Sequence, residues 1–397
     1  MISAQEASKI ILSQIEPLGP ETVPLSESLG RFLANSIVAP IPLPPFDHAA
    51  MDGLAVRSGD TEAASRRTPV SLKIIGTIAA GDSGSLFLKE GQAVRIMTGA
   101  PIPTGADAVV PFEEIPVVDP VQQGSHIRRT GEDVAEGEEV LQAGEKITPR
   151  TIALLAALGQ ATVRVIRRPR VTLLGTGSEL VEPGERLGPG KIYNSNVPAL
   201  TAALREIGVG PASILTSSDA EKELAEKIRR GLDSEVLVTV GAVSAGDFDR
   251  IPAILRQQGA EILFHKVAVK PGKPLLFASH GRCLIFGLPG NPVSSLTIFE
   301  RFVRPALLKM MGSAHPFPII QRAFVVESLQ GTGGREDYLR GIVEWQEGRW
   351  TARSAGRQGS ASLKPLARAN ALLIIPADRE TVPTGDEIEF TALGEGR

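Results

Sequence analysis

The sequence predicts a multidomain α/β protein built around a doubly wound, mostly parallel sheet. Between residues 169 and 312, continuous apolar runs typical of buried strands alternate with glycine-containing loops and helix-like segments. On either side of this region, short β-like runs are separated by glycine and proline, a pattern typical of smaller β domains. With 397 residues, 42% of them hydrophobic, the chain is long and apolar enough to bury several cores.

We expect four parts along the chain. Residues 1–39 and 141–168 form a helical N-terminal and linker domain, and residues 40–140 form a β-rich domain inserted into it. Residues 169–315 form the α/β domain, and residues 316–397 form a C-terminal domain resembling a β-barrel. Parallel sheets bind ligands beyond the carboxyl ends of their strands, which is where the glycine loops of the α/β domain fall.

The helical part is predicted from side-chain spacing and cap residues. Apolar residues between Ile10 and Ile15 alternate with charged ones at helical spacing, which is not the pattern of a secretion signal. Residues 26–34, "SESLGRFLA", indicate a second short helix. Thr148 is a natural N-cap and Gly159 a natural terminator of a third. We expect this third helix to complete the module that the N-terminal helix begins.

Charge and cysteine content exclude several classes of protein. A formal net charge of -3 provides no overall basic field for nucleic acid or anionic lipid. Cys283 is the only cysteine, so a disulfide within the chain is impossible and a structural zinc site is not expected. No apolar run approaches membrane-spanning length. We therefore expect a cytoplasmic protein, in which any metal is hard and bound by oxygen.

Two glycine loops follow predicted strands of the α/β domain. In "GLPGNPVSS", Gly287 and Gly290 let the backbone approach a ligand closely, and free N–H groups at the next helix suit a phosphate. A tight strand-to-helix turn is the alternative explanation. In "GTGSEL", Glu179 either caps the next turn or holds magnesium beside a bound phosphate. Neither loop matches a dinucleotide-binding or Walker fingerprint.

Lysines and carboxylates add charge beside these loops. The segment "HKVAVKPGKP" places Lys266, Lys270 and Lys273 within eight positions, and in a strand Lys266 and Lys270 would share a face. A solvated face is the alternative, although the flanking segments are apolar. Other loops carry carboxylates, each of which alone suits a turn or a cap: Asp52, Asp133, Asp219, Asp247 and Asp249. Together these charges are what magnesium-dependent phosphate transfer requires.

Seven segments, in this order along the chain, resemble one known family. They are "PPFDHAAMDGLAV", "RIMTGAPIPTGADAVV", "GEDVAEGEEVLQAGEKITP", "GTGSEL", "GKIYNSN", "KVAVKPGKP" and "GLPGNPVSS". The chain is similar to the molybdopterin molybdenumtransferases, the MoeA and gephyrin E-domain family, over nearly its whole length and least clearly after residue 316.

The resemblance implies a four-part, elongated subunit with an α/β domain of the molybdopterin-binding type. Members of the family use magnesium to cleave adenylylated molybdopterin and insert molybdate, releasing AMP and molybdenum cofactor. The resemblance further implies a homodimer whose cleft lies between subunits. Its implied protein partners are a molybdopterin adenylyltransferase and molybdoenzyme chaperones.

The resemblance also implies roles for individual residues. The expected catalytic residues are Asp52, Thr98, Asp133, Lys266 and Lys270. The expected metal ligands are Glu179, Asp219 and Asp249. The expected substrate-binding residues are Gly177, Ser178, Gly287, Pro289, Gly290, Asn291, Lys273, Arg340 and Ser360. By the same resemblance, the rigid loop "MTGAPIPTGADAVV" presents Thr98 to the cleft.

Three positions depart from the family pattern. Ala242 replaces a usual glycine, His48 a usual Asn or Ser, and Leu54 a common Tyr. The added methyl group of Ala242 could crowd a ligand and alter substrate preference. Two alternative functions therefore stay open, a non-catalytic pterin-binding scaffold and a paralogue that prefers tungstate. The lysines and carboxylates favour the enzyme, because a scaffold has no need to keep mutually repelling charges together.

Overall fold

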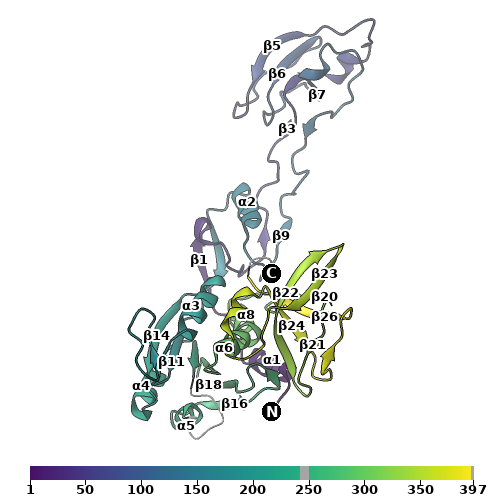
Figure 1. Ribbon diagram of the computed structural model, residues 1–397. Coiled ribbons are helices and arrows are strands. Elements are labelled where there is room, and N and C mark those ends of the chain that lie inside the picture. The colour runs from purple at the N-terminus through teal and green to yellow at the C-terminus, as the bar shows by residue number, and fades with distance from the viewer. Residues whose placement is uncertain (242–249, 395–397) are drawn as a thin grey trace.

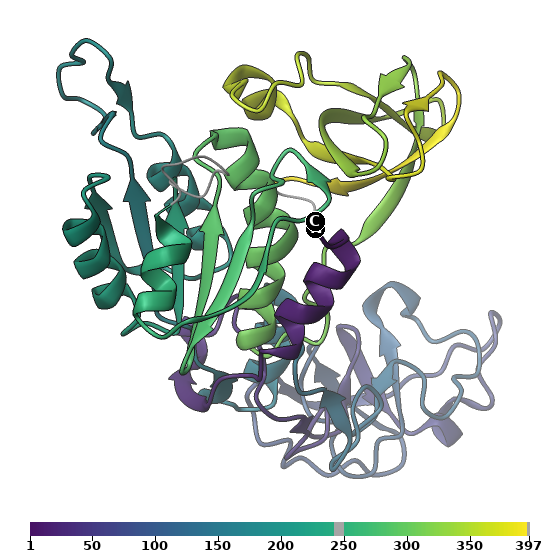
Figure 2. The same ribbon diagram turned by 90° about the horizontal axis from the view of Figure 1, so that it is seen from below.

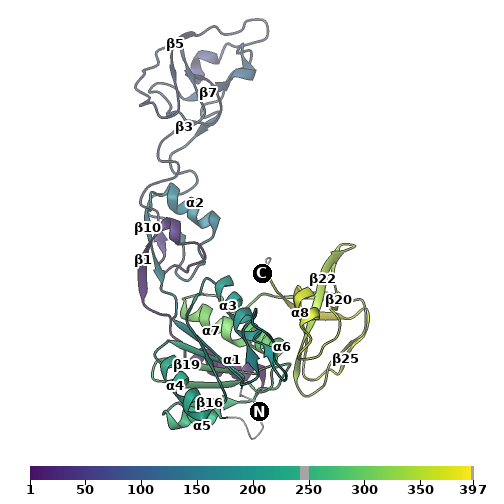
Figure 3. The same ribbon diagram turned by 60° about the vertical axis from the view of Figure 1, so that its left-hand side comes forward.

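The computed structural model describes residues 1–241 and 250–394. The subunit is elongated (Figure 1). The inserted residues 40–140 lie at one end, and the α/β region and the C-terminal β region lie side by side at the other, as the rotated view in Figure 3 also shows. In the described part of the chain, no helix combines the length and apolarity that crossing a membrane requires.

A six-stranded sheet with the order β14-β11-β15-β19-β18-β16 forms the centre of the α/β region. Its parallel strands are β14 (Pro211–Ser217), β11 (Val171–Thr176), β15 (Val236–Val240) and β19 (Cys283–Leu288). Its antiparallel edge consists of β18 (Leu276–His280) and β16 (Glu261–His265). The predicted mostly parallel sheet is confirmed. From β11 the chain first adds β14 on one side of that strand and then crosses over to add β15 on its other side. The direction in which strands are added to the sheet therefore reverses between β11 and β15.

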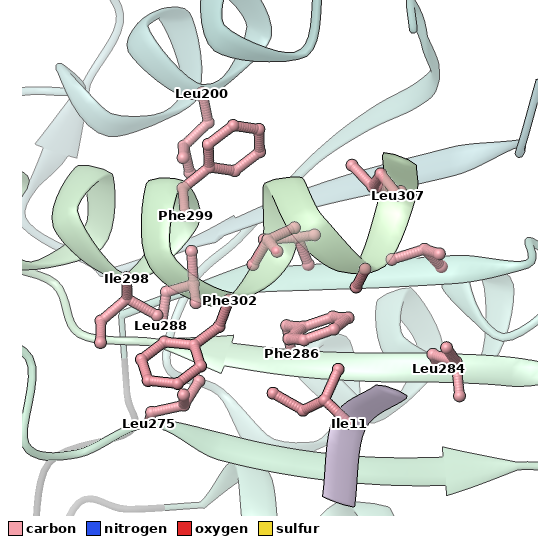
Figure 4. Close-up of a cluster of buried hydrophobic side chains, with 14 of the residues drawn as sticks. Ile11, Leu200, Leu275, Leu284, Phe286, Leu288, Ile298, Phe299, Phe302 and Leu307 are labelled. Atoms are coloured by element: carbon pink, nitrogen blue, oxygen red, sulfur yellow. The ribbon is translucent and has the colours of Figure 1, made fainter. Parts of the chain in front are cut away.

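Helices cover both faces of this sheet (Figure 2). One face carries α1 (Ala4–Ser13), α3 (Asn196–Glu206), α6 (Pro292–Ile298), the π-helical turn η4 (Phe299–Val303) and α7 (Arg304–Met310). The other face carries α4 (Glu221–Gly231) and α5 (Ile251–Gln257). Figure 4 shows Phe302 of η4 beside Phe286 of β19 and Leu275, which precedes β18, and Phe299 of η4 on the other side of this helical segment, beside Leu200 of α3. All of these side chains are buried, so this cluster anchors the helix that follows the "GLPGNP" loop.

The N-terminal helix α1 belongs to this core. Its Ala7 and Ile11 are buried in the same cluster as Leu307 of α7. The helix α2 (Pro149–Ala157) instead packs beside β1 (Pro20–Pro24) and β10 (Thr162–Ile166). The expectation that α2 completes a module begun by α1 is therefore wrong, because α1 buries its apolar face on the α/β sheet.

Local signals for helices gave mixed results. The cap of α2 is confirmed, since Thr148 Oγ1 accepts the Thr151 N–H at 3.2 Å. Residues 26–34 do not form the predicted helix. They contain the end of a 3-10 turn, η1 (Leu25–Glu27), a turn at residues 29–30 and isolated β-bridges at Phe32 and Leu33. Gly30 interrupts any helix there, because its φ of +75° lies outside the helical region.

The inserted region is β-rich, as predicted. Its four-stranded sheet has the order β5-β6-β4-β7. The strands are β5 (Lys73–Ile78), β6 (Gln92–Ile96), β4 (Gly53–Val56) and β7 (Ala108–Pro111). Smaller elements of the region and its base are β2 (Ile37–Val38), β3 (His48–Ala49), η2 (Ser58–Thr61), η3 (Phe112–Glu114), β8 (Ile127–Arg128) and β9 (Glu139–Leu141). The chain enters and leaves through the β2–β9 pair, so the insert is tethered by two backbone segments.

The C-terminal region is a closed barrel. The ring follows the order β22-β23-β20-β26-β24, and a further pairing of β22 with β24 closes it. The strands are β20 (Ile320–Val325), β22 (Glu336–Gln346), β23 (Arg349–Ser354), β24 (Ala371–Ile375) and β26 (Glu387–Ala392). β17 (Val269–Lys270) joins this sheet from the α/β region. Shorter elements of the C-terminal region are β21 (Leu329–Gln330), α8 (Leu363–Arg368) and β25 (Thr381–Val382). In the α/β region, β12 (Leu180–Val181) and β13 (Ile192–Tyr193) form a separate two-stranded sheet.

Candidate active site

Three loops meet at the carboxyl edge of the central sheet, where the strand order reverses. They follow β11, β15 and β19. A Cβ atom on Gly290, after β19, would lie 3.6 Å from Gly241 Cα, after β15. Gly241 has a φ of +100°, and a Cβ there would collide with the Thr176 carbonyl of β11. At Gly241 only glycine allows the loops to approach this closely, whereas Gly290 has ordinary contact distances and an exposed backbone that a ligand can reach.

Two carboxylates flank Ser178 in the loop after β11. Asp219 Oδ2 accepts the Ser178 N–H at 3.0 Å, and Ser178 Oγ accepts the Asp219 N–H at 3.1 Å. The Glu179 carboxylate folds back over Gly177, where a Cβ would lie 2.6 Å from Glu179 Oε2. Lys191 Nζ donates to the Ser178 carbonyl at 2.5 Å. The structure therefore brings Gly177, Ser178, Glu179 and Asp219 together, and it adds Lys191.

The third expected metal ligand, Asp249, lies outside the described residues, as do Asp247 and Ala242. Within residues 1–241 and 250–394, no group of three or more His, Cys, Asp or Glu side chains could hold a metal. Glu179 and Asp219 nevertheless fit magnesium, which binds through one or two carboxylates, substrate phosphates and water. Both are hard oxygen donors beside an open glycine loop.

The loop between β19 and α6 is held from the side by α3. Asn196 Nδ2 donates to the Gly290 carbonyl at 2.7 Å, and Ser295 Oγ donates to Asn196 Oδ1 at 3.1 Å. Gly287 and Pro289 are buried, whereas Gly290 and Asn291 are exposed. The residue-by-residue assignment missed Asn196, although it lies in the "GKIYNSN" segment that marked the family resemblance.

The barrel contacts this loop directly. Asn291 Nδ2 donates to Ser360 Oγ at 3.3 Å, and α8 of the barrel packs near α6. Ser360 is half-buried. The contact places the loop that carries Ser360 beside the "GLPGNP" loop, so two of the predicted substrate-binding residues adjoin each other across the domain boundary.

Arg340 of β22 is a buried cation next to the same barrel loop. Only 1% of the residue is exposed. Its guanidinium donates to the Gly359 carbonyl at 3.2 Å and to the Tyr338 carbonyl at 3.4 Å, and its Nε has no partner. No carboxylate among the described residues forms an ion pair with it. Burial lowers the pKa of Arg340 to about 10.

The predicted lysine arrangement needs a correction. β16 ends at His265 and β17 contains only Val269 and Lys270, so Lys266 and Lys270 do not share a face of one strand. The chain turns at Lys266, which has a φ of +87°. Lys266 and Lys270 are each partly exposed and Lys273 is exposed. Lys270 Nζ lies 3.8 Å from Asp337 Oδ1 of the barrel.

Asp52 and Thr98 meet in the inserted region. Asp52 Oδ1 accepts both the backbone N–H of Thr98 at 2.7 Å and its hydroxyl at 2.8 Å. These two bonds hold the pKa of the exposed Asp52 carboxyl below its usual value. Asp133 is exposed near the base of the insert, and its N–H donates to the Leu43 carbonyl at 3.0 Å. Within one subunit the β4–β7 sheet lies far from the three loops (Figure 1, Figure 3).

The fold and these loops define a protein with a molybdopterin-binding type of α/β domain. Residues 172–309 match the family described as the probable molybdopterin binding domain. Residues 2–159 match the MoeA N-terminal region, domains I and II, and residues 323–393 match the MoeA C-terminal region, domain IV. The chain belongs to the MoeA family of molybdopterin molybdenumtransferases, and the resemblance found in the sequence is confirmed.

Individual relatives cover almost the whole chain. Molybdopterin molybdenumtransferase 2 of Mycobacterium tuberculosis (strain ATCC 25618 / H37Rv) is 39% identical over 406 residues, covering 99% of this chain and 100% of the relative. Molybdopterin molybdenumtransferase of Bacillus subtilis (strain 168) is 38% identical, covering 94% and 90%. The crystal structure of the molybdopterin biosynthesis moeA protein from Pyrococcus horikoshii OT3 has a TM-score of 0.85 at 32% identity, covering 99% and 100%.

Proposed function

We propose that this transferase of molybdenum cofactor biosynthesis inserts molybdate into adenylylated molybdopterin in a magnesium-dependent reaction that releases AMP. One observation carries the proposal. The loops that bear Glu179 and Gly290 meet at the reversal point of the central sheet, and the barrel reaches the second of them through the Asn291–Ser360 hydrogen bond. Such a point is where sheets of this kind bind ligands.

The residues divide into an adenylate end and an oxyanion end. Glu179 and Asp219 would hold magnesium, and the backbone N–H groups of the "GLPGNP" loop would receive the pterin phosphate. Magnesium bound there supplies positive charge to the phosphate oxygens. Lys266 and Lys270 would bind molybdate from one side.

Arg340 would bind the oxyanion from the barrel side. Its guanidinium is buried, has no carboxylate partner among the described residues and retains an unsatisfied Nε–H. A buried cation of this kind is destabilising until an anion arrives. An incoming molybdate supplies both the missing charge and the missing hydrogen-bond acceptor.

Completing the site takes two subunits. Asp52 and Thr98 lie on the insert, at the opposite end of the subunit from Glu179. We therefore propose a homodimer in which the insert of one subunit reaches the loops of its partner, with Asp133 near the base of the insert. In this proposal the protein is cytoplasmic, receives its substrate from a molybdopterin adenylyltransferase and delivers its product to molybdoenzyme chaperones.

The test is an AMP-release assay with purified protein, adenylylated molybdopterin, magnesium and either molybdate or tungstate. We expect release that requires magnesium and molybdate. Faster release with tungstate would instead identify a tungstate-preferring paralogue. No release with either oxyanion, together with retained pterin binding, would identify a non-catalytic scaffold. Sedimentation of the same protein would test the dimer, and a monomer that turns over would contradict the two-subunit site.

A further inference from the structure

The segment that carries Lys270 is built into the barrel sheet. β17 pairs in parallel with β22, with Val269 opposite Glu336 and Lys270 opposite Asp337. The Glu336 N–H donates to the Ala268 carbonyl at 3.0 Å. The backbone position of Lys270 therefore depends on a barrel strand, although this lysine belongs to the α/β region in sequence.

Asp337 is the residue of β22 that faces Lys270. It is 1% exposed. Its Oδ2 accepts the backbone N–H and the hydroxyl of Thr332, both at 2.8 Å. Its Oδ1 has no hydrogen-bond partner in the described part of the chain, and Lys270 Nζ lies 3.8 Å from it. One oxygen is thus fixed by the barrel, and the other is directed to the lysine.

A buried carboxylate with one unsatisfied oxygen is costly unless a cation balances it. Lys270 is that cation, but 45% of its side chain is exposed, so its ammonium group is also accessible to a ligand. A lysine side chain has four rotatable bonds and adopts many conformations in water unless a partner restrains it. The geometry of Asp337 fits such a restraint.

We propose that Asp337 is a positioning residue that holds the Lys270 ammonium group ready for the oxyanion, a role that rests on the proposed function. Arg340 lies three residues further along β22. The same barrel strand therefore sets the position of both cations, one through Asp337 and one directly. Asp337 does not itself touch the substrate in this arrangement.

The test is a double-mutant cycle with Asp337→Asn, Lys270→Met and the double variant. The amide oxygen of Asp337→Asn still accepts both bonds from Thr332, so the variant is expected to fold. We expect Asp337→Asn to lower kcat about tenfold and to change the KM for molybdate less than about threefold, because the cation remains but is misplaced. In the Lys270→Met background, the same substitution should change either constant by less than about twofold.

Asp107→Asn is the matched control. Asp107 Oδ1 accepts the backbone N–H of Ser58 at 2.6 Å and Asp107 Oδ2 accepts its hydroxyl at 2.9 Å, a comparable set of bonds divided between the two oxygens, and Asp107 forms no ion pair in the described part of the chain. It should leave kcat and KM at parent values. Thermal unfolding of all variants shows whether each is folded under the assay conditions.

Equal effects of Asp337→Asn in the parent and in Lys270→Met would overturn the positioning role. If the parent releases no AMP, the proposed function fails, and the cycle is then measured by calorimetric titration of the four proteins with molybdate. In that titration, loss of the Asp337→Asn effect in the Lys270→Met background supports positioning, and an unchanged effect contradicts it.

Discussion

Replacing Arg340 with methionine is expected to stabilise the ligand-free protein while weakening oxyanion binding. Burial lowers the pKa of Arg340 from 12.5 to about 10, and at about 1.36 kcal/mol per pKa unit the charged form costs roughly 3 kcal/mol in the folded state. The pKa of Arg340 lies above 7 in both the folded and the unfolded state, so its guanidinium group is charged at pH 7 in both states. The cost is therefore fully present there, and it is relieved only as the pH rises through about 10.

Methionine is unbranched and uncharged and matches the aliphatic part of arginine as far as Nε, so it removes this cost. It also removes two long hydrogen bonds, to the carbonyls of Gly359 and Tyr338, which offset about 1 to 2 kcal/mol of the gain. The net expectation is a rise of about 1 to 2 kcal/mol in the free energy of unfolding, in line with other replacements of buried charges by apolar groups.

The assay combines urea unfolding of the ligand-free protein with molybdate titrations of AMP release. Arg340→Met should raise the molybdate concentration for half-maximal turnover at least about tenfold, the value of one charge-assisted hydrogen bond. Arg322→Met, on the same barrel but 66% exposed, is the control and should change neither quantity appreciably. A loss of more than about 1 kcal/mol in Arg340→Met would show that Arg340 is a structural donor. An unchanged titration would refute the oxyanion site.

Three other substitutions test separate parts of the site. Glu179→Gln keeps the side-chain shape but removes the charge of a proposed magnesium ligand, so we expect normal folding and loss of magnesium-dependent AMP release. If AMP release depends on magnesium concentration as in the parent, Glu179 only caps the turn. A Cβ atom at position 290 would make only ordinary contacts within the protein, so weaker pterin binding by Gly290→Val in calorimetry would indicate that the valine obstructs the ligand. Equal pterin affinity of the variant and the parent would contradict the assignment of this loop to phosphate binding. Lys266→Gly places at this positive φ a residue that adopts it readily, so we expect the free energy of unfolding to stay within about 1 kcal/mol of the parent while turnover falls. Turnover equal to that of the parent would show that Lys266 is not part of the active site.

The local pattern of the sequence was enough to predict the central sheet. Continuous apolar runs such as those of β11 and β15 are buried on both faces, and a parallel sheet covered by helices is the environment in which such strands are typical. The position of α1 could not be predicted in the same way. An amphipathic helix indicates that one face is buried, but it does not indicate which element buries it.

The candidate site was partly accessible to the same reasoning. The glycine loops and Glu179 were found because close backbone approach requires glycine, which leaves a visible mark in the sequence. The turn at Lys266 could not be predicted from the sequence, because lysine rarely adopts the positive φ that this position has. The family resemblance identified Arg340, but its isolation from carboxylates follows only from the packing of the barrel. The assigned roles and the domain boundaries stay predictions.

The place of α1 in the α/β core has a consequence for synthesis on the ribosome. Leu18 just after this helix donates its N–H to the Met310 carbonyl at 2.8 Å, and Lys309 Nζ donates to the Leu12 carbonyl at 2.8 Å. The partners of the first helix are thus translated about 300 residues later, which at about 5 to 20 residues per second is a delay of roughly 15 to 60 seconds. The insert can fold during that interval, whereas α1 must wait with its apolar face exposed. A chaperone that shields nascent apolar segments would find its target in the first twenty residues.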